Sequence, residues 1–311
     1  MRFIKPKFWD KKKLSMLSIL LFPFTIIYLI ALWISKVLIS LKSYRKPPIP
    51  TICIGNIYIG GTGKTPLVRE IFKITKSIGK NPAIIKKHYD YLDDEIEMLK
   101  DTGKTYTDKK RLKSIFQSFN DNHDVAILDD GFQDLSIKSN LSILCFNSKQ
   151  NIGNGLLIPS GPLREGMGSI SRADCVVING DKDLNFEKKL KENFGNKKFD
   201  IFYSNYKIKN IEKFKNKEIT AVAGIGNPSN FFDLLKENNL NVIDTYSFPD
   251  HHNYSEKDFE KIKKNKTSKI VTTEKDYYRM NKLQKENCEI VKVDLEIDNI
   301  YEFTKIIKSS L

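Results

Sequence analysis

A glycine-rich turn joins a β-branched run to a helical pattern in residues 51–66, which read TICIGNIYIGGTGKTP. Glycine has no Cβ atom, so such a backbone can curl around phosphate groups with its N–H groups pointing inward. The helix that follows presents the positive end of its dipole to the same anion. The pattern therefore predicts a loop that binds a nucleoside triphosphate, formed by Gly60, Gly61, Thr62, Gly63, Lys64 and Thr65.

Two side chains of this loop have distinct expected roles. Lys64 would reach the β- and γ-phosphates, and the Thr65 hydroxyl would hold Mg²⁺. The usual pattern G-x-x-x-x-G-K-[ST] has glycine where this chain has Tyr58, so the loop belongs to a divergent subgroup. The adjacent pair Gly60-Gly61 offers another source of backbone freedom.

A second motif, which is acidic, follows an apolar strand pattern in residues 125–133, which read VAILDDGFQ. Parallel strands of a nucleotide-binding sheet end on the ligand side, so a carboxylate there reaches Mg²⁺ directly or through water. Aspartates at strand ends are also common turn residues. With the glycine-rich loop upstream, the motif predicts that Asp129 and Asp130 hold the metal, and which of the two contacts it directly stays open.

Two further segments combine turn-forming residues with reactive side chains. Residues 153–165 read GNGLLIPSGPLRE and end in Arg164 and Glu165, and residues 248–252 read FPDHH. A histidine in a loop is more often a surface residue than a catalyst, and an Asp-His-His triplet also suggests a metal phosphoesterase. The further aspartate ligands of such an enzyme are not evident, so spacing alone leaves the role of His251 open.

The N-terminal region carries a long uncharged stretch. Residues 14–35 read LSMLSILLFPFTIIYLIALWIS, which at about 1.5 Å per residue could cross a hydrocarbon core of about 30 Å. Residues 1–50 hold ten Lys or Arg residues and a single acidic residue, Asp10. The length argues against a cleaved signal peptide, and the uniformly apolar surface argues against a soluble core helix. We therefore expect a retained membrane anchor that spans the bilayer or lies in its surface, with Pro23 kinking it or limiting its entry.

The 311-residue chain has a formal net charge of +14, and 45 of its 52 basic residues are lysine. A basic surface gains about 1 kcal/mol per Lys near anionic lipids, and it also attracts an acidic substrate or nucleic acid. A bias toward Lys, Asn and Ile along the whole chain explains the charge equally well. The cysteines form no C-x-x-C pair, which indicates free thiols in a reducing compartment. They are Cys53, Cys145, Cys175 and Cys288.

Short apolar runs alternate with helical patterns along the rest of the chain. The expected strands are 51–54, 83–86, 124–128, 141–146 and 174–178, then 219–223, 242–245 and 269–271 beyond a lysine-rich polar border at 181–199. The expected helices include 64–78, 230–238 and 255–264. Such alternation predicts an α/β fold with a P-loop-type, mostly parallel sheet lobe over residues 47–205. A second, smaller α/β lobe is expected over 206–311, and the membrane anchor helix over 1–46.

Six motifs in one order resemble the tetraacyldisaccharide 4′-kinases (lipid A 4′-kinases) of Gram-negative bacteria. They are GN-x-x-x-GGTGKTP at 55–66, DDGFQ at 129–133, GNG-x-x-x-P-x-GPLRE at 153–165, GIGNP at 224–228, FPDHH at 248–252 and TTEKD at 272–276. The family's loop does not require glycine at the position of Tyr58, and the N-terminal apolar helix is also a family feature. Two segments depart from the family pattern: KKHYD at 86–90 replaces S-R-G-Y-G, and Asp134 stands where the family commonly has histidine.

The resemblance implies phosphate transfer from ATP, with Mg²⁺, to the 4′-hydroxyl of a lipid-anchored disaccharide 1-phosphate. It places this reaction at the bacterial inner membrane, with the catalytic lobes on the cytoplasmic side. In the family, the acid of a G-D-E-P motif acts with the histidine of the D-H motif as a base dyad, which implies Asp94 and His251 as catalytic residues beside Lys64. In this motif Asp93 replaces the family's glycine and Ile96 its proline, and the stretch before it is shorter than in the family. The register of the motif can therefore differ by one residue, and Asp93 and Glu95 remain alternative bases.

Two other classes of function fit parts of the sequence. A membrane-docked P-loop nucleotide switch would hydrolyse ATP slowly, respond to a protein and phosphorylate no lipid. A nucleic-acid-binding ATPase would bind DNA or RNA in a salt-sensitive way, but the sequence lacks the interleaved aromatic and basic residues of a single-strand groove. We therefore expect a kinase whose partners are its lipid substrate and inner-membrane lipids, with no nucleic acid and no obligate protein partner.

Overall fold

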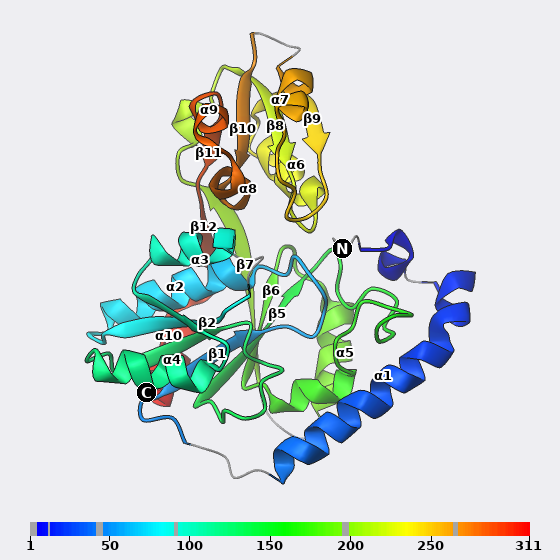
Figure 1. The fold of residues 1–311 in the computed structure, drawn as a ribbon, viewed down its shortest axis with the longest axis vertical. Helices are drawn as coiled ribbons and strands as arrows, with labels where there is room; N and C mark the ends of the chain where they lie inside the picture. Colours follow the sequence, from blue (N-terminus) through cyan, green and yellow to red (C-terminus); the bar gives the residue numbers. More distant parts are fainter. Residues whose placement is uncertain (1–4, 12, 42–45, 90–92, 195–198, 264–266) are drawn as a thin grey trace. The chain divides into compact units, whose positions relative to one another are not determined.

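The computed structural model describes residues 5–11, 13–41, 46–89, 93–194, 199–263 and 267–311. The chain forms two compact units, each with its own sheet. The larger unit consists of Pro6–Asp90, Thr102–Asn205 and Ile297–Leu311, and the smaller unit mainly of Tyr91–Asp101 and Tyr206–Glu296. The prediction of an α/β fold with a P-loop-type, mostly parallel sheet and an N-terminal apolar helix is confirmed (Figure 1).

An eight-stranded sheet in the order β12-β7-β6-β5-β1-β4-β2-β3 forms the core of the larger unit, although most of β12 and the end of β7 fall within the residue range of the smaller unit. Its strands are β1 (Thr51–Gly55), β2 (Pro82–Lys87), β3 (Thr105–Asp108), β4 (Val125–Asp129), β5 (Leu141–Asn147), β6 (Cys175–Asn179), β7 (Asp200–Ile208) and β12 (Val293–Ile297). The neighbouring pairs from β3 to β7 are parallel. Every residue of β1, β4 and β6 is buried, which is why these strands read as continuous apolar runs.

Helices with one apolar side pack against this sheet. They are α2 (Lys64–Ser77), α4 (Arg111–Asn120), α5 (Leu184–Phe194) and α10 (Ile300–Ser310), together with the short 3₁₀-helix η2 (Met167–Arg172). A second 3₁₀-helix, η1 (Lys7–Asp10), precedes α1 and contacts it. α2 contacts β1, β2 and β4 through side chains that recur at helical spacing, among them Leu67, Ile71 and Ile74. It ends just before Gly79, whose φ of +84° lies in the left-handed region that glycine adopts without strain.

The smaller unit is built on a four-stranded parallel sheet in the order β11-β10-β8-β9. Its strands are β8 (Glu218–Ala223), β9 (Asn241–Ser247), β10 (Lys269–Thr273) and β11 (Glu289–Val291). Its helices are α3 (Asp93–Lys100), α6 (Pro228–Glu237), α7 (Glu256–Ile262), α8 (Glu274–Arg279), α9 (Lys282–Glu286) and the 3₁₀-helix η3 (Ile211–Lys213). Phe231, Phe232 and Leu235 of α6 pack on Ile219 and Ala221 of β8, so this unit has a separate apolar core.

The lobe boundaries predicted from the sequence differ from these units in two places. α3, expected within residues 47–205, contacts α8 in the smaller unit. α10, expected within residues 206–311, belongs to the larger unit, where Phe303 is buried and its ring centre lies 5.0 Å from that of Phe202. Packing between segments that are distant along the chain decides both placements.

The predicted polar border at 181–199 is wrong over part of its length, because α5 lies within it. Phe186, Leu190 and Phe194 form the buried side of this helix, and the ring centres of Phe186 and Phe146 are 5.3 Å apart. Lysine dominates the composition of the segment because it occupies the solvent-facing side. The spacing of the three apolar residues, rather than the composition, carries the helical signal.

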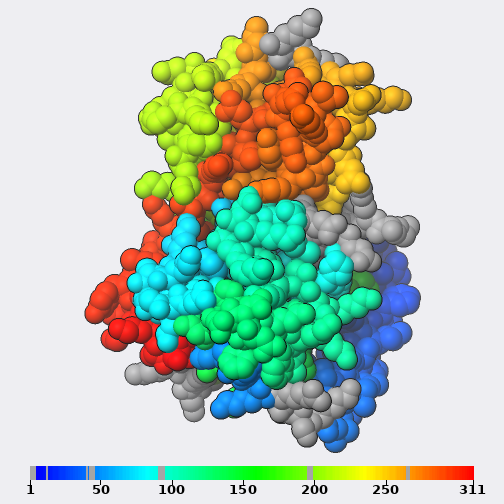
Figure 2. All heavy atoms as spheres, turned by 60° about the vertical axis from the view of Figure 1, so that its left-hand side comes forward, coloured from blue at the N-terminus to red at the C-terminus, as the bar shows by residue number. Residues whose placement is uncertain are grey.

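The N-terminal apolar stretch forms α1 (Met16–Ser40), which begins after Ser15 and contains Pro23. The Ser15 hydroxyl caps the helix by accepting the Ser18 N–H at 3.1 Å. By length and composition, Met16–Ile39 could cross a membrane. α1 forms part of the outer surface of the larger unit, and most of its large apolar side chains are exposed (Figure 2).

The four cysteines are buried free thiols. Burial raises the pKa of the Cys53, Cys145 and Cys288 thiols to about 12, so these groups stay protonated near neutral pH. The prediction of free thiols is confirmed, and the reducing compartment stays a prediction.

Candidate active site

The glycine-rich loop connects the end of β1 to the first residue of α2, where the sequence predicts it. Gly60 and Gly63 have φ values of +87° and +90°, in the left-handed region that side-chain-bearing residues rarely adopt. Open space lies where a Cβ atom of Gly60 would be, so backbone conformation rather than crowding requires glycine there. Because Gly63 caps α2 and Lys64 begins it, the unpaired N–H groups of the first helical turn belong to the loop.

Tyr58 shows why this loop does not need the first glycine of the usual pattern. Its side chain is fully buried, and its hydroxyl donates a hydrogen bond to the Asp10 carboxylate. The backbone on either side is held as well, since the Ile59 N–H donates to the Pro162 carbonyl at 2.9 Å and the Arg164 N–H donates to the Ile57 carbonyl at 2.7 Å. The loop is therefore fastened to residues 153–165, a second motif segment that lies far along the chain.

Asn56 and Gln133, which are not predicted as site residues from the sequence, hold the loop through hydrogen bonds. The Asn56 side-chain amide donates to the Thr62 hydroxyl at 2.8 Å, and both residues are buried. Gln133 donates to the Asn56 carbonyl at 2.7 Å. Their positions within the GN and DDGFQ motifs are the signal that could have identified them. These bonds connect the phosphate-binding loop to the segment that follows β4.

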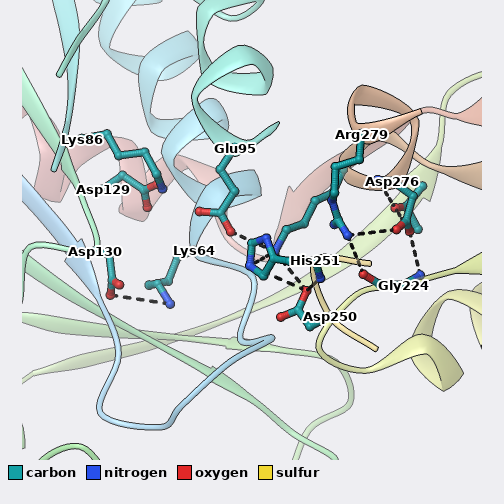
Figure 3. A network of polar contacts seen from close by, with 12 residues as sticks. Lys64, Lys86, Glu95, Asp129, Asp130, Gly224, Asp250, His251, Asp276 and Arg279 are labelled. Atoms are coloured by element: carbon teal, nitrogen blue, oxygen red, sulfur yellow. Dashed lines mark hydrogen bonds and ion pairs between the residues drawn. The ribbon is translucent and has the colours of Figure 1, made fainter. Parts of the chain in front are cut away.

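Asp130 lies between cations. Its carboxylate accepts bonds from Arg164 Nη1 at 3.0 Å to each oxygen, and Lys64 Nζ lies 3.6 Å from Oδ1 (Figure 3). Burial disfavours the ionised carboxylate, but Lys64 and Arg164 outweigh this effect and hold the pKa of Asp130 well below its usual range. Arg111 fixes the backbone at this point by donating to the Asp130 carbonyl at 2.6 Å. Asp130 is therefore a fixed anion beside the loop lysine.

Asp129 meets a different cation, Lys86 of β2. The two residues are opposite each other across the parallel pair β2–β4, and Lys86 Nζ lies 2.5 Å from Asp129 Oδ2 with both side chains buried (Figure 3). Lys86 is not predicted as this partner from the sequence, although it lies in the segment KKHYD at 86–90, which departs from the family pattern. Asp134, the other departure, accepts a bond from the buried Arg111 at 3.2 Å. Lys86 and Asp134, which both lie in these departures, therefore each form an ion pair beside the aspartate motif.

The donor set at this edge of the sheet suits a magnesium ion. Asp129 Oδ1 is buried and has no hydrogen-bond partner among the residues that the structure describes, which leaves one carboxylate oxygen available. Carboxylate and hydroxyl oxygens are the ligands that Mg²⁺ prefers, and it commonly uses one or two carboxylates together with substrate phosphates. Asp129, Asp130 and the Thr65 hydroxyl are the candidate groups, as the sequence predicts.

The smaller unit gathers a second polar cluster around Lys275. The Lys275 ammonium lies 2.9 Å from Glu95 Oε1, 3.3 Å from Asp250 Oδ1 and 3.3 Å from His251 Nε2. His251 itself has a φ of +56°, a backbone conformation that is uncommon outside glycine and recurs at functional sites. The structure thus brings together His251 and the α3 segment, which the sequence predicts as partners (Figure 3). Lys275, from the TTEKD motif, is an additional member.

Of the three candidate bases, Glu95 is the one whose side chain the structure describes. Asp93 and Asp94 lie in the first turn of α3, and their side chains are outside the described part of the structure. Glu95 is described, and its carboxylate is paired with Lys275. The predicted pairing of Asp94 with His251 therefore stays a prediction.

Other residues of these motifs hold the smaller unit together. Asp276 is fully buried and accepts the Gly224 N–H at 3.0 Å and the Tyr254 hydroxyl at 2.9 Å (Figure 3). His252, the second histidine of FPDHH, contacts Asp258 at 3.0 Å in the cap of α7. The GIGNP, FPDHH and TTEKD motifs are therefore tied to one another around β8, which gives His251 its place.

A glycine-rich loop between β1 and α2, with an aspartate pair at the end of the adjacent β4, defines a P-loop nucleoside-triphosphate-binding protein. The sequence profile of the family described as tetraacyldisaccharide-1-P 4′-kinase matches residues 17–311. This chain belongs to that family.

Its relatives match over nearly the whole chain. Proteins named tetraacyldisaccharide 4′-kinase are 39% identical in Pelagibacter ubique, over 99% of this chain and 98% of that protein, and 32% identical in Rickettsia canadensis, over 96% and 94%. The protein of that name from Francisella tularensis subsp. novicida is 31% identical, over 94% of this chain and 99% of its own length. A crystal structure of LpxK from Aquifex aeolicus in complex with ATP has a TM-score of 0.75 at 24% identity, covering 95% of this chain and 99% of that chain. This last likeness establishes the shared fold.

The ion pair of Lys86 with Asp129 predicts a large cost for removing the lysine alone. In Lys86→Met, a buried carboxylate loses its cation, so we expect the free energy of unfolding to fall by about 3–5 kcal/mol. Lys87→Met is the matched control, because Lys87 is only partly buried and lies over the Tyr89 ring at 5.3 Å. Urea unfolding in detergent micelles, followed by circular dichroism, measures both. Equal stability of the two variants would contradict the pairing.

Proposed function

We propose that this chain transfers the γ-phosphate of ATP to the 4′-hydroxyl of a tetraacyldisaccharide 1-phosphate, the reaction for which its family is named. The observation that carries the proposal is the P-loop with Lys64 beside the ion-paired Asp130, within a chain that matches the family over residues 17–311. Phosphoryl transfer depends mainly on positioning and on neutralising charge, and both are properties of this loop.

On the nucleotide side, Lys64 and the loop N–H groups bind the phosphate oxygens and stabilise the negative charge of the transition state. Mg²⁺, held by Thr65 and by Asp129 or Asp130, would neutralise further phosphate charge when it is bound. Lys64 and Arg164 hold the pKa of Asp130 below its usual range and so keep it ionised, and Lys86 pairs with one oxygen of Asp129. The Asp130 carboxylate is therefore already an anion before any metal binds.

On the acceptor side, a carboxylate of α3 and the imidazole of His251 take the proton of the sugar hydroxyl as the new bond forms. Glu95 is already paired with Lys275, and that pairing lowers its availability as a base. This supports Asp94 as the base, with Glu95 and Lys275 holding the first turn of α3 near the histidine. Asp250 contributes by placing a second carboxylate on the same lysine.

α1 attaches the enzyme to the inner membrane by lying along its cytoplasmic surface. Its contacts with the larger unit extend from Ser18 to Lys36, or about 27 Å of helix at about 1.5 Å per residue. If α1 spanned the bilayer, the irregular segment 154–165 that it contacts would lie at the depth of the hydrocarbon, where irregular backbone is tolerated only inside protein or beside a water-filled cavity. The exposed apolar side chains, such as Leu20, Ile27 and Trp33, are then available to the lipid. This position keeps the catalytic units in the cytoplasm, beside a substrate whose acyl chains remain embedded.

The kinase reaction is tested with γ-labelled ATP, Mg²⁺ and tetraacyldisaccharide 1-phosphate in detergent micelles. We expect label in the lipid and a loss of about a hundredfold or more in rate for Lys64→Ala, because that change removes charge stabilisation in the transition state. Lys80→Ala, which alters an exposed lysine beyond α2, is the control. ATP hydrolysis without labelled lipid, in a folded preparation, would instead indicate the nucleotide switch.

The identity of the base is tested by comparing Asp94→Asn, Glu95→Gln and His251→Ala in the same assay. We expect kcat to fall at least about a hundredfold for Asp94→Asn and His251→Ala, since each removes a member of the proton-accepting pair. Glu95→Gln should cost less, because its carboxylate serves to position Lys275. A larger loss for Glu95→Gln than for Asp94→Asn would transfer the role of base to Glu95.

Membrane attachment is tested by placing charges on the outer side of α1. In the double variant Leu20→Asp/Ile27→Asp, two side chains that are 70% and 63% exposed become charged, and we expect co-flotation with anionic vesicles to fall about tenfold or more. ATP binding should persist, because neither side chain contacts the loop. Leu184→Asp, at an equally exposed site on α5, is the control. Undiminished flotation of the double variant would exclude α1 as the attachment site.

A further inference from the structure

A few polar side chains in α1 point to a second role for this helix. Thr25 is 3% exposed and Ser18 is fully buried, although the surrounding residues of α1 are apolar and largely exposed. Together with Tyr28 and Lys36, they contact one segment of the larger unit, residues 154–165 (Figure 1). Attachment to lipid requires none of these groups, and a buried hydroxyl is unfavourable unless it is hydrogen-bonded.

The contacts are specific hydrogen bonds. Thr25 donates to the Leu157 carbonyl at 3.3 Å or to the Ser160 hydroxyl at 2.8 Å, and it accepts the Ser160 N–H at 3.2 Å. The Tyr28 hydroxyl donates to the Arg164 carbonyl at 2.9 Å. These bonds define the position of the segment relative to α1 at both of its ends.

The residue after Arg164 is held by a second set of charges. Glu165 is almost fully buried, and it pairs with Lys36 of α1 at 2.9 Å and with Arg172 at 2.8 Å. The Arg172 guanidinium in turn lies 4.4 Å from the ring centre of Phe132, two residues beyond Asp130. The backbone around Arg164 is therefore fixed from α1 on one side and from the aspartate motif on the other.

The same segment touches the nucleotide site directly. Its backbone pairs with the glycine-rich loop through Pro162 and Arg164, and the Arg164 guanidinium lies on the Asp130 carboxylate. A shift of the Arg164 backbone would move the guanidinium away from Asp130 and disturb the loop at Ile57 and Ile59. The Tyr28 hydrogen bond is thus made to the backbone of the same residue whose guanidinium pairs with Asp130 beside Lys64.

We propose that Thr25 and Tyr28 are positioning residues, which hold Arg164 on Asp130 and so set the affinity of the site for Mg²⁺·ATP. The outer side of α1 then contacts lipid, and its inner side positions the segment that carries Arg164. The role assigned to Asp130 rests on the proposed kinase function, whereas the bracing of the loop is a property of the fold alone.

The inference is tested with Thr25→Val and Tyr28→Phe, which remove one hydroxyl each and keep the shape of the side chain. Ser35→Ala is the matched control, because the Ser35 hydroxyl is exposed and, within the described part of the chain, bonds only to the Ala31 carbonyl of its own helix. In detergent micelles, we expect the Kd for Mg²⁺·ATP to rise about three- to tenfold in the first two variants and to stay unchanged in the control. Thr25→Ser, which retains the hydroxyl, should bind ATP as the wild type does.

Hydrogen exchange of the backbone amides provides a readout that does not depend on activity. Amides of residues 154–165 should exchange faster in Thr25→Val and Tyr28→Phe, while those of β1 and β4 stay protected. Co-flotation with vesicles should be unaffected, since the outer side of α1 is intact. Global loss of protection in Thr25→Val would instead reveal misfolding of that variant, in which case Tyr28→Phe decides, because a Kd equal to that of Ser35→Ala would overturn the proposal.

A double-mutant cycle with Arg164→Lys tests whether Tyr28 acts through the arginine. We expect Tyr28→Phe to change the Kd for Mg²⁺·ATP in the wild-type background and to have little further effect when Arg164 is already altered. An equal effect in both backgrounds, or ATP binding by Thr25→Val and Tyr28→Phe that matches Ser35→Ala, would overturn the proposal. A wild type that binds ATP without labelling the lipid would reject the kinase function and leave this test unaffected.

Discussion

The parallel pairing of β1 with β4 is the constraint on which the candidate nucleotide site depends. Ile54 lies opposite Asp129 across these strands, so the chain leaves both of them at the same edge of the sheet. The glycine-rich loop and the aspartate pair meet there for that reason. Every residue of both strands is buried, and the hydrophobic effect therefore maintains the pairing. The polar chemistry at the edge of the sheet is positioned by an apolar core.

Each carboxylate at this edge is paired with a cation. The buried Asp129 contacts the buried Lys86, and the partly exposed Asp130 contacts Lys64 and Arg164. Removing Lys86 alone would leave an uncompensated charge in a poorly solvated place, which is more costly than replacing both partners of the pair. The pairs also fix the direction of each carboxylate before a ligand binds. Phosphoryl transfer benefits from such fixed charges, because it depends on positioning and electrostatic stabilisation more than on covalent chemistry.

α1 combines two kinds of surface that are usually found on different helices. Its exposed apolar side chains suit lipid, whereas a narrow polar stripe that includes Thr25 and Tyr28 bonds to the segment carrying Arg164. Composition over the whole helix suggests only a membrane anchor, because the stripe contributes few residues. Hydrogen bonds are directional, so these few residues define how the helix sits on the larger unit. The two roles that we propose for α1, membrane attachment and positioning of the nucleotide site, would thereby share one element.

The sequence by itself determined the features that are decided within a few residues of chain. These are the glycines of the phosphate-binding loop, the buried strands β1 and β4, the amphipathic α2 and the apolar α1, and their motifs identified the family. Only the tertiary structure decided the pairing of Lys86 with Asp129, which are 43 positions apart, and of Glu95 with Lys275. It also decided that α3 belongs to the smaller unit and α10 to the larger one. Backbone preference and burial pattern are local and can be recognised along the chain, whereas partners distant in the chain are chosen by how whole elements pack together.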